Sequence, residues 1–147
     1  MDENSTIALF APNHVDYVPI CMAASVCGCK LTPVNPQYKA TELSKVLNQS
    51  QSSVLITHWS CLEVALQAVK DSPTVKHVIT IPEDDGEAGV AGGTISLTSL
   101  KEHSNPLYVT NDAAKKNPAS HAVLLPYSSG TTGLPKVSDV QSLNELI

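Results

Sequence analysis

The sequence contains no arginine: its nine basic residues are all lysines, and the net charge is −5. Arginine supplies the planar fork that holds phosphate or guanine through two hydrogen bonds. The lysines are scattered, and only Lys115 and Lys116 are adjacent. The composition therefore predicts that nucleic acid is not a partner.

Long apolar runs are also missing. No stretch reaches the roughly eighteen apolar residues that a membrane-spanning helix needs, so we expect no span. Asp2 and Glu3 stand where a secretory signal would carry basic residues. These features favour an intracellular protein without a visible targeting signal.

The four cysteines show no C-x-x-C spacing. Cys21, Cys27 and Cys29 fall in an apolar segment, where cysteine behaves as a small buried hydrophobe, so we expect reduced core thiols. His58 and Cys61 are three residues apart and would share one face of a helix. No second pair completes a zinc site, and no metal is predicted.

The middle of the chain alternates between two hydrophobic periodicities. Short apolar runs predict buried strands, and segments with apolar residues three and four apart predict helices. The expected strands cover 5–13, 31–36, 53–57, 75–81 and 122–127, and the expected helices cover 14–30, 41–51 and 61–71. Residues 82–93 predict a solvated loop, 94–102 fit a strand or a helix, and 111–121 form a polar connector.

Strands that alternate with helices of this length predict an α/β fold. Stacked βαβ units would form a mostly parallel sheet with helices on both faces. In the first helix, Asn13 is a candidate N-cap, Pro19 would shorten or bend the helix, and Gly28 would end it. Its apolar residues recur at helical spacing, namely Val15, Val18, Met22, Val26 and Cys29.

One segment near residue 130 has a different composition from the rest: "LLPYSSGTTGLPK", residues 124–136. A strand followed by a loop of glycines and hydroxyl side chains is a common phosphate-binding arrangement, because backbone N–H groups of the loop can turn inward around an anion. Lys136 adds a mobile positive charge. The spacing is not that of a Walker A loop, because Pro135 stands five places after Gly130, where the second glycine belongs, and Val137 follows Lys136 in place of a serine or threonine.

The ten residues 127–136, "YSSGTTGLPK", resemble the signature phosphate loop of the adenylate-forming (AMP-binding) enzymes, in the acyl-CoA synthetase and 4-coumarate–CoA ligase branch. The resemblance implies that a carboxylate attacks ATP to give an acyl-adenylate and pyrophosphate, and that coenzyme A then takes the acyl group. It implies ATP and Mg²⁺ as cofactors and a carboxylic acid and coenzyme A as substrates. The residues that would contact ATP are Ser128, Ser129, Gly130, Thr131, Thr132 and Lys136.

Further upstream, a G-x-x-x-x-P-x-N-P pattern is similar to the early large domain of the same family. It consists of Gly28, Pro33, Asn35 and Pro36. The resemblance stops at Val137, where the family continues with glycine. We therefore expect residues 1–136 to be an incomplete AMP-binding N-terminal domain and 137–147 to be a divergent tail.

An incomplete domain has predictable weaknesses. The strand before the phosphate loop would lack a neighbour, the loop would be anchored at one end only, and the chain alone would not catalyse adenylation. The tail can be drawn as a short helix that presents Val140, Leu143 and Ile147 on one side. Full-length members of the family are cytoplasmic or peroxisomal, which the resemblance carries over as an expectation.

Two other functions fit parts of the sequence. The first alternative is a non-catalytic module that binds ATP or pyrophosphate, or that pairs with a full-length relative through an open sheet edge. A small hydrolase would need G-x-S-x-G around its nucleophile, and neither Ser128 nor Ser129 has that frame. His121 is near in sequence, but no spacing argument joins it to either serine.

Overall fold

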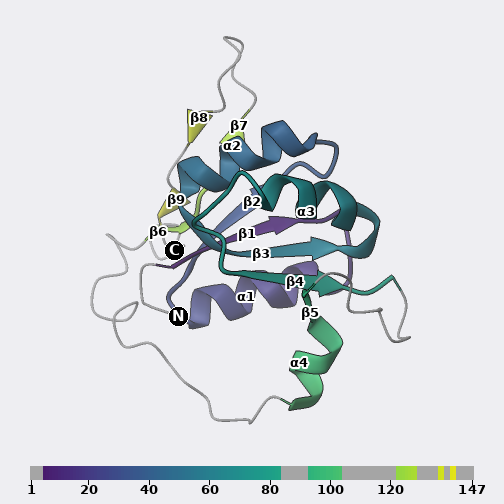
Figure 1. Cartoon of the computed structure of the whole chain (residues 1–147). Helices are drawn as coiled ribbons and strands as arrows, with labels where there is room; N and C mark the ends of the chain where they lie inside the picture. The colour runs from purple at the N-terminus through teal and green to yellow at the C-terminus, as the bar shows by residue number, and fades with distance from the viewer. Residues whose placement is uncertain (1–4, 84–92, 104–121, 129–135, 138–139, 142–147) are drawn as a thin grey trace.

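The computed structural model describes residues 5–83, 93–103, 122–128, 136–137 and 140–141. Figure 1 shows one twisted sheet with helices on both faces. Its seven strands run in the order β5-β4-β3-β1-β2-β6-β9. All pairs are parallel except β6 with β9. The predicted α/β fold with a mostly parallel sheet is confirmed.

The central strand is β1 (Thr6–Phe10), in which every residue is buried. It pairs with β2 (Lys30–Val34) on one side and with β3 (Ser52–His58) on the other. Beyond β3 come β4 (His77–Ile81) and the two-residue β5 (Ile95–Ser96). A strand buried on both faces reads as a continuous apolar run, which is why the sequence predicts these strands.

Helices α2 (Ala40–Ser50) and α3 (Leu62–Val69) cover one face of the sheet. Leu43, Val46 and Leu47 of α2 are fully buried there, together with Ala65 and Ala68 of α3. A short 3₁₀ turn, η1 (Trp59–Cys61), precedes α3. Because His58 ends β3 and Cys61 lies in η1, the two residues do not share a helical face as the sequence suggested.

The opposite face is covered by α1 (Tyr17–Val26) and α4 (Leu97–His103). The ambiguous segment 94–102 thus forms a strand and then a helix. In α1 the apolar residues that recur at helical spacing do not mark the side that meets the sheet. Ile20 and Ala24 face the sheet, whereas Val15 just before α1 is 82% exposed and Val18 and Met22 within it are 63% and 65% exposed.

The ends of α1 also differ from the sequence prediction in one respect. Asp16, not Asn13, occupies the N-cap position. Pro19 lies in the first turn, where its missing N–H costs no helical hydrogen bond, and α1 continues past it to Val26. Gly28 follows the helix with φ +69°, the left-handed conformation typical of a helix terminus.

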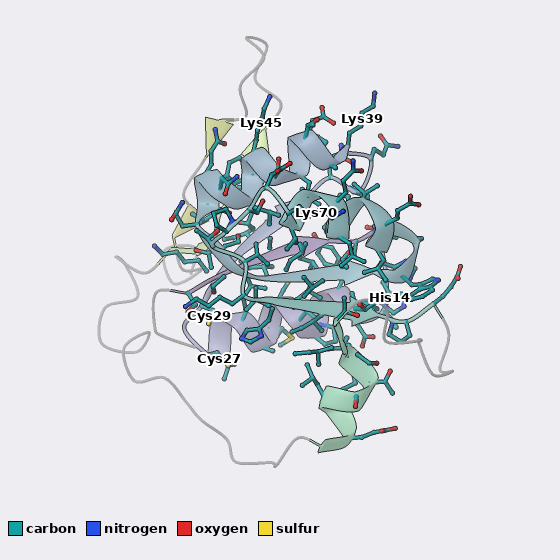
Figure 2. The ribbon with its side chains drawn as sticks, viewed as in Figure 1. His14, Cys27, Cys29, Lys39, Lys45 and Lys70 are labelled. Carbon is teal, nitrogen blue, oxygen red and sulfur yellow. The ribbon has the colours of Figure 1, made fainter. Side chains whose placement is uncertain are left out.

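The cysteines vary in exposure. All four are free, and only Cys29 is buried, while Cys27 is exposed at the end of α1 (Figure 2). The expectation that all three cysteines of the first apolar segment are buried is therefore wrong. In the described part of the chain, no helix has both the length and the hydropathy that a membrane crossing requires.

Candidate functional site

The phosphate-loop motif begins where the sheet ends. Strand β6 (Ala122–Leu124) pairs with β2 through Leu31 and Leu124, and the Leu125 N–H donates to the Leu31 carbonyl at 2.8 Å. The chain then enters β7 (Tyr127–Ser128), which pairs antiparallel with β8 (Lys136–Val137) in a separate two-stranded sheet.

The β7–β8 pair joins the two ends of the motif. Ser128 lies opposite Lys136, and Tyr127 lies opposite Val137. The expectation of a loop anchored at one end only is therefore wrong, because both ends meet in one short antiparallel ladder. Among the predicted contact residues, Ser129, Gly130, Thr131 and Thr132 lie outside the described residues, and Ser128 and Lys136 are described by their backbone.

The strand that precedes the motif has a neighbour on each side. Strand β9 (Val140–Gln141) pairs antiparallel with β6, with Leu124 opposite Val140. Two expectations are corrected by this pairing. Val140 lies in a strand and not in a helix, and the edge of β6 opposite β2 is occupied by the chain's own residues. Leu143 and Ile147 lie outside the described residues.

Tyr127 connects the motif to the core below α2. Its half-buried side chain packs against the apolar cluster formed mainly by β1, α2 and α3. Burial raises the pKa of the Tyr127 hydroxyl, and a hydrogen bond with the Ser50 side chain opposes that rise. Ser50 in turn lies 2.6 Å from Ser52, Oγ to Oγ, and both serines are buried.

A second group of polar side chains lies at the carboxyl ends of β1 and β3. The imidazole rings of His14 and His58 have their centroids 5.4 Å apart. The Nδ1 atom of His14 accepts the Asp16 N–H at 3.2 Å, and the Nδ1 atom of His58 accepts the Ser60 N–H at the same distance.

Asp16 ties this end of the sheet to α4. Its Oδ1 accepts a hydrogen bond from Lys101 Nζ at 2.6 Å, and its Oδ2 lies 3.6 Å from His14 Nδ1. Next to it, a pocket of about 280 Å³ opens between the loops that follow β1 and β2. Its lining is uncharged and includes Asn13, Tyr17 and Asn35.

The histidine pair predicts an acid-sensitive stability. Burial lowers the pKa of His58, the nearby His14 lowers it further, and Glu83 opposes them. The unfolded chain therefore takes up this proton more readily, and the contribution of His58 is present above about pH 6.5 and lost as the pH falls through the depressed pKa.

We expect the free energy of unfolding, measured in urea, to decrease from pH 7.5 to pH 5. In His58→Asn the slope of this free energy against pH should be smaller. Asparagine keeps an acceptor for the Ser60 N–H and does not titrate. His77 is exposed on β4, so His77→Asn serves as the matched control and should leave the slope unchanged. Equal slopes for His58→Asn and the parent chain would contradict this assignment.

Sequence comparison relates the chain to AMP-binding enzymes. The family model described as AMP-binding enzyme matches residues 1–138. The chain is 33% identical over 136 residues to 4-coumarate–CoA ligase 1 of Petroselinum crispum, covering 92% of this chain and 23% of that protein. It is 29% identical to 4-coumarate–CoA ligase 1 of Arabidopsis thaliana, with 92% and 24% covered. The chain thus spans about a quarter of the length of these relatives.

Solved structures show the same fold. A long-chain-fatty-acid–CoA ligase from Archaeoglobus fulgidus superposes with a TM-score of 0.75 at 27% identity, covering 95% of this chain and 25% of that one. A luciferase from Phrixothrix hirtus gives 0.78 at 23% identity, with 96% and 34% covered, and supports the fold alone. Because the family model covers nearly the whole sequence, the chain belongs to the AMP-binding enzyme family.

Proposed function

We propose that residues 127–136 bind the β- and γ-phosphates of ATP and its pyrophosphate product. The observation that supports this is the β7–β8 pair, which places Ser128 opposite Lys136 and so brings the two ends of the motif together. A segment whose ends are held together loses less conformational entropy on binding an anion than a free segment of equal length. Ser128, Ser129, Gly130, Thr131, Thr132 and Lys136 are the proposed contacts.

The chemistry of these residue types suits a phosphate group. Serine and threonine hydroxyls donate neutral hydrogen bonds, glycine lets backbone N–H groups approach closely, and lysine contributes a charge-assisted bond. The segment contains no carboxylate. We therefore propose that Mg²⁺ arrives already bound to the nucleotide phosphates, because Mg²⁺ in such sites is held largely by phosphate oxygens and water.

In the intact family we infer the reaction carboxylate plus ATP to acyl-adenylate plus pyrophosphate, followed by thioester formation with coenzyme A. Donors around the β- and γ-phosphates would stabilise the negative charge that develops as pyrophosphate leaves. The names of the relatives support an acid–coenzyme A ligase. We propose that residues 1–136 supply the phosphate-binding part of an AMP-binding domain, that residues 137–147 are a tail of divergent sequence, and that this polypeptide by itself binds nucleotide without turnover.

Binding is tested by titrating the full chain with Mg-pyrophosphate and Mg-ATP in a calorimeter. Removing the charge in Lys136→Ala should weaken binding about tenfold or more, since hydrogen bonds to charged groups contribute about 1.5–3 kcal/mol. Lys76→Ala removes an exposed lysine next to β4 and should leave the affinity unchanged. Equal affinities for Lys136→Ala and the parent chain would overturn the assignment.

The absence of turnover is tested separately. Purified chain is incubated with labelled pyrophosphate, Mg-ATP and a panel of aromatic and fatty carboxylic acids. No label should enter ATP. Exchange above the level of a Lys136→Ala sample would show that the polypeptide forms acyl-adenylates unaided.

A further inference from the structure

The side of α1 that faces away from the sheet is exposed and apolar. Figure 1 shows α1 as an outer layer on its face of the sheet. Between residues 15 and 27 every exposed residue is apolar, and α1 itself contains no charged residue. The exposed residues of this side, which we call the outer face of α1, are Val15, Val18, Pro19, Met22, Ala23, Val26 and Cys27.

The outer face of α1 is one continuous surface. Its residues follow each other at spacings of three and four, so they lie on the same side of the helix. A helix on a protein surface normally places polar side chains toward the solvent, and a helix that is apolar all round is normally buried. Contiguous exposed apolar surface marks sites of interaction. The outer face of α1 therefore has the character of an interface.

Charge indicates what kind of partner this face accepts. The first lysine of the chain is Lys30, so α1 lacks the basic residues with which a surface helix binds a lipid headgroup layer. A charged partner surface would lose its hydration against this face and gain no counter-charge. The partner surface must therefore be uncharged and apolar as well.

A second copy of the chain offers such a surface. The outer face of α1 is uncharged, so two of these faces meet without placing one charge against another, although each copy carries a net charge of −5. The other large apolar residues that are exposed in the described part of the chain lie on three different elements and form no comparable face. They are Trp59, Ile95 and Leu100.

We propose that two copies of the chain associate through the outer faces of their α1 helices, as an antiparallel pair around a two-fold axis. Opposite ends of the two helix dipoles then lie side by side, and the two Asp16 carboxylates stay at opposite ends of the contact. Val15 of one copy would lie opposite Val26 of the other, and Met22 would lie near the axis, opposite Pro19 of the other copy. No residue of the phosphate-loop motif takes part.

The size of the face sets the expected strength of the pair. A standard stable interface contains about 20–30 residues on each side. The outer face of α1 supplies seven residues. We therefore expect a weak and reversible dimer, with a dissociation constant between about 1 μM and about 1 mM.

Sedimentation equilibrium of the full chain tests the association. Between about 10 μM and about 1 mM the mean mass should rise from that of the 15.6 kDa monomer toward twice that value. Met22→Lys and Val18→Lys should each weaken the association at least about tenfold, because every dimer would then bury unpaired ammonium groups. Both positions are exposed in the monomer, so the variants should fold, and circular dichroism checks this.

Gln49→Lys is the matched control. Gln49 is exposed on α2, on the opposite face of the sheet, and its replacement makes the same change in net charge. The association should stay as in the parent chain. Because each added lysine makes the chain less negative, a change in overall charge repulsion would strengthen the association of all three variants, which is the opposite of the result expected for Met22→Lys and Val18→Lys.

Cross-linking tests the antiparallel arrangement. Met22→Cys places a thiol near the axis in both copies, so a short bifunctional maleimide should join two chains of this variant. Cys27 is exposed at the end of α1, and an antiparallel pair keeps the two Cys27 thiols at opposite ends. The parent chain should therefore cross-link much less than Met22→Cys.

Three results would overturn the proposal. A monomeric mass at every concentration would assign the outer face of α1 to a different kind of partner. Association that Met22→Lys leaves unchanged would place the contact on another surface of the chain. Equal cross-linking of the parent chain and Met22→Cys would contradict the antiparallel pair.

Discussion

Phe10→Ala is expected to lower the free energy of unfolding by about 3–5 kcal/mol, the usual cost of truncating a fully buried phenylalanine. Phe10 is the only phenylalanine of the chain and has 0% exposure. It ends the central strand, and its ring belongs to the cluster under α2 and α3. A cavity there cannot be filled without moving strands that are hydrogen-bonded on both sides. Urea denaturation followed by circular dichroism measures the loss.

Val18→Ala is the matched control for this prediction. Val18 is apolar as well, but it is 63% exposed on α1, so its truncation should change stability by no more than about 0.5 kcal/mol. A loss for Val18→Ala comparable to that for Phe10→Ala would show that this side of α1 is buried in solution.

Two positions with left-handed backbone should respond to substitution with opposite signs. Gly28 follows α1 with φ +69° and is buried, and Gln51 follows α2 with φ +52°. A Cβ atom in this conformation costs about 1–2 kcal/mol. Gly28→Ala should therefore destabilise the fold by about that amount, while Gln51→Gly should stabilise it by about 0.5–1 kcal/mol, because glycine removes the same strain.

Thermal or urea unfolding of both variants checks the sign. The gain for Gln51→Gly is smaller because the Gln51 side chain donates to the Asn48 carbonyl at 2.6 Å, and that exposed bond is lost. Stabilisation by Gly28→Ala would contradict the backbone conformation described after α1.

Local patterns in the sequence predict the elements that have one polar and one apolar side. The segment 41–51 is an example, because Leu43, Val46 and Leu47 mark the buried face and polar residues mark the other. Helix α1 shows where such reasoning fails. The helix has no charged residue and is apolar around its circumference, so its sequence does not indicate which side meets the sheet. The structure buries Ile20 and Ala24 and leaves the Val18–Met22 side in solvent.

The residue types of the candidate site could be predicted from the sequence, but their arrangement in space could not. The motif at 127–136 can be recognised because its residue types recur in phosphate-binding loops. The pairing of Ser128 with Lys136, and the pairing of β6 with β2 that brings the motif to the sheet, depend on backbone contacts that the residue types do not indicate. His14 and His58 each follow a predicted strand, but only the order of the strands places β1 beside β3 and brings the two rings together.

The central place of β1 has a consequence for synthesis on the ribosome. Among the described strands β1 is made first, and the described segments that cover its edges and faces all follow it in the sequence. Until residues 30–58 have emerged, the nascent chain presents Ile7, Leu9 and Phe10 to any hydrophobic surface nearby. β6 pairs with β2 across more than ninety residues of sequence, at Leu31 and Leu124, so the strand that carries the phosphate motif is added late, to a sheet that β1 has already organised.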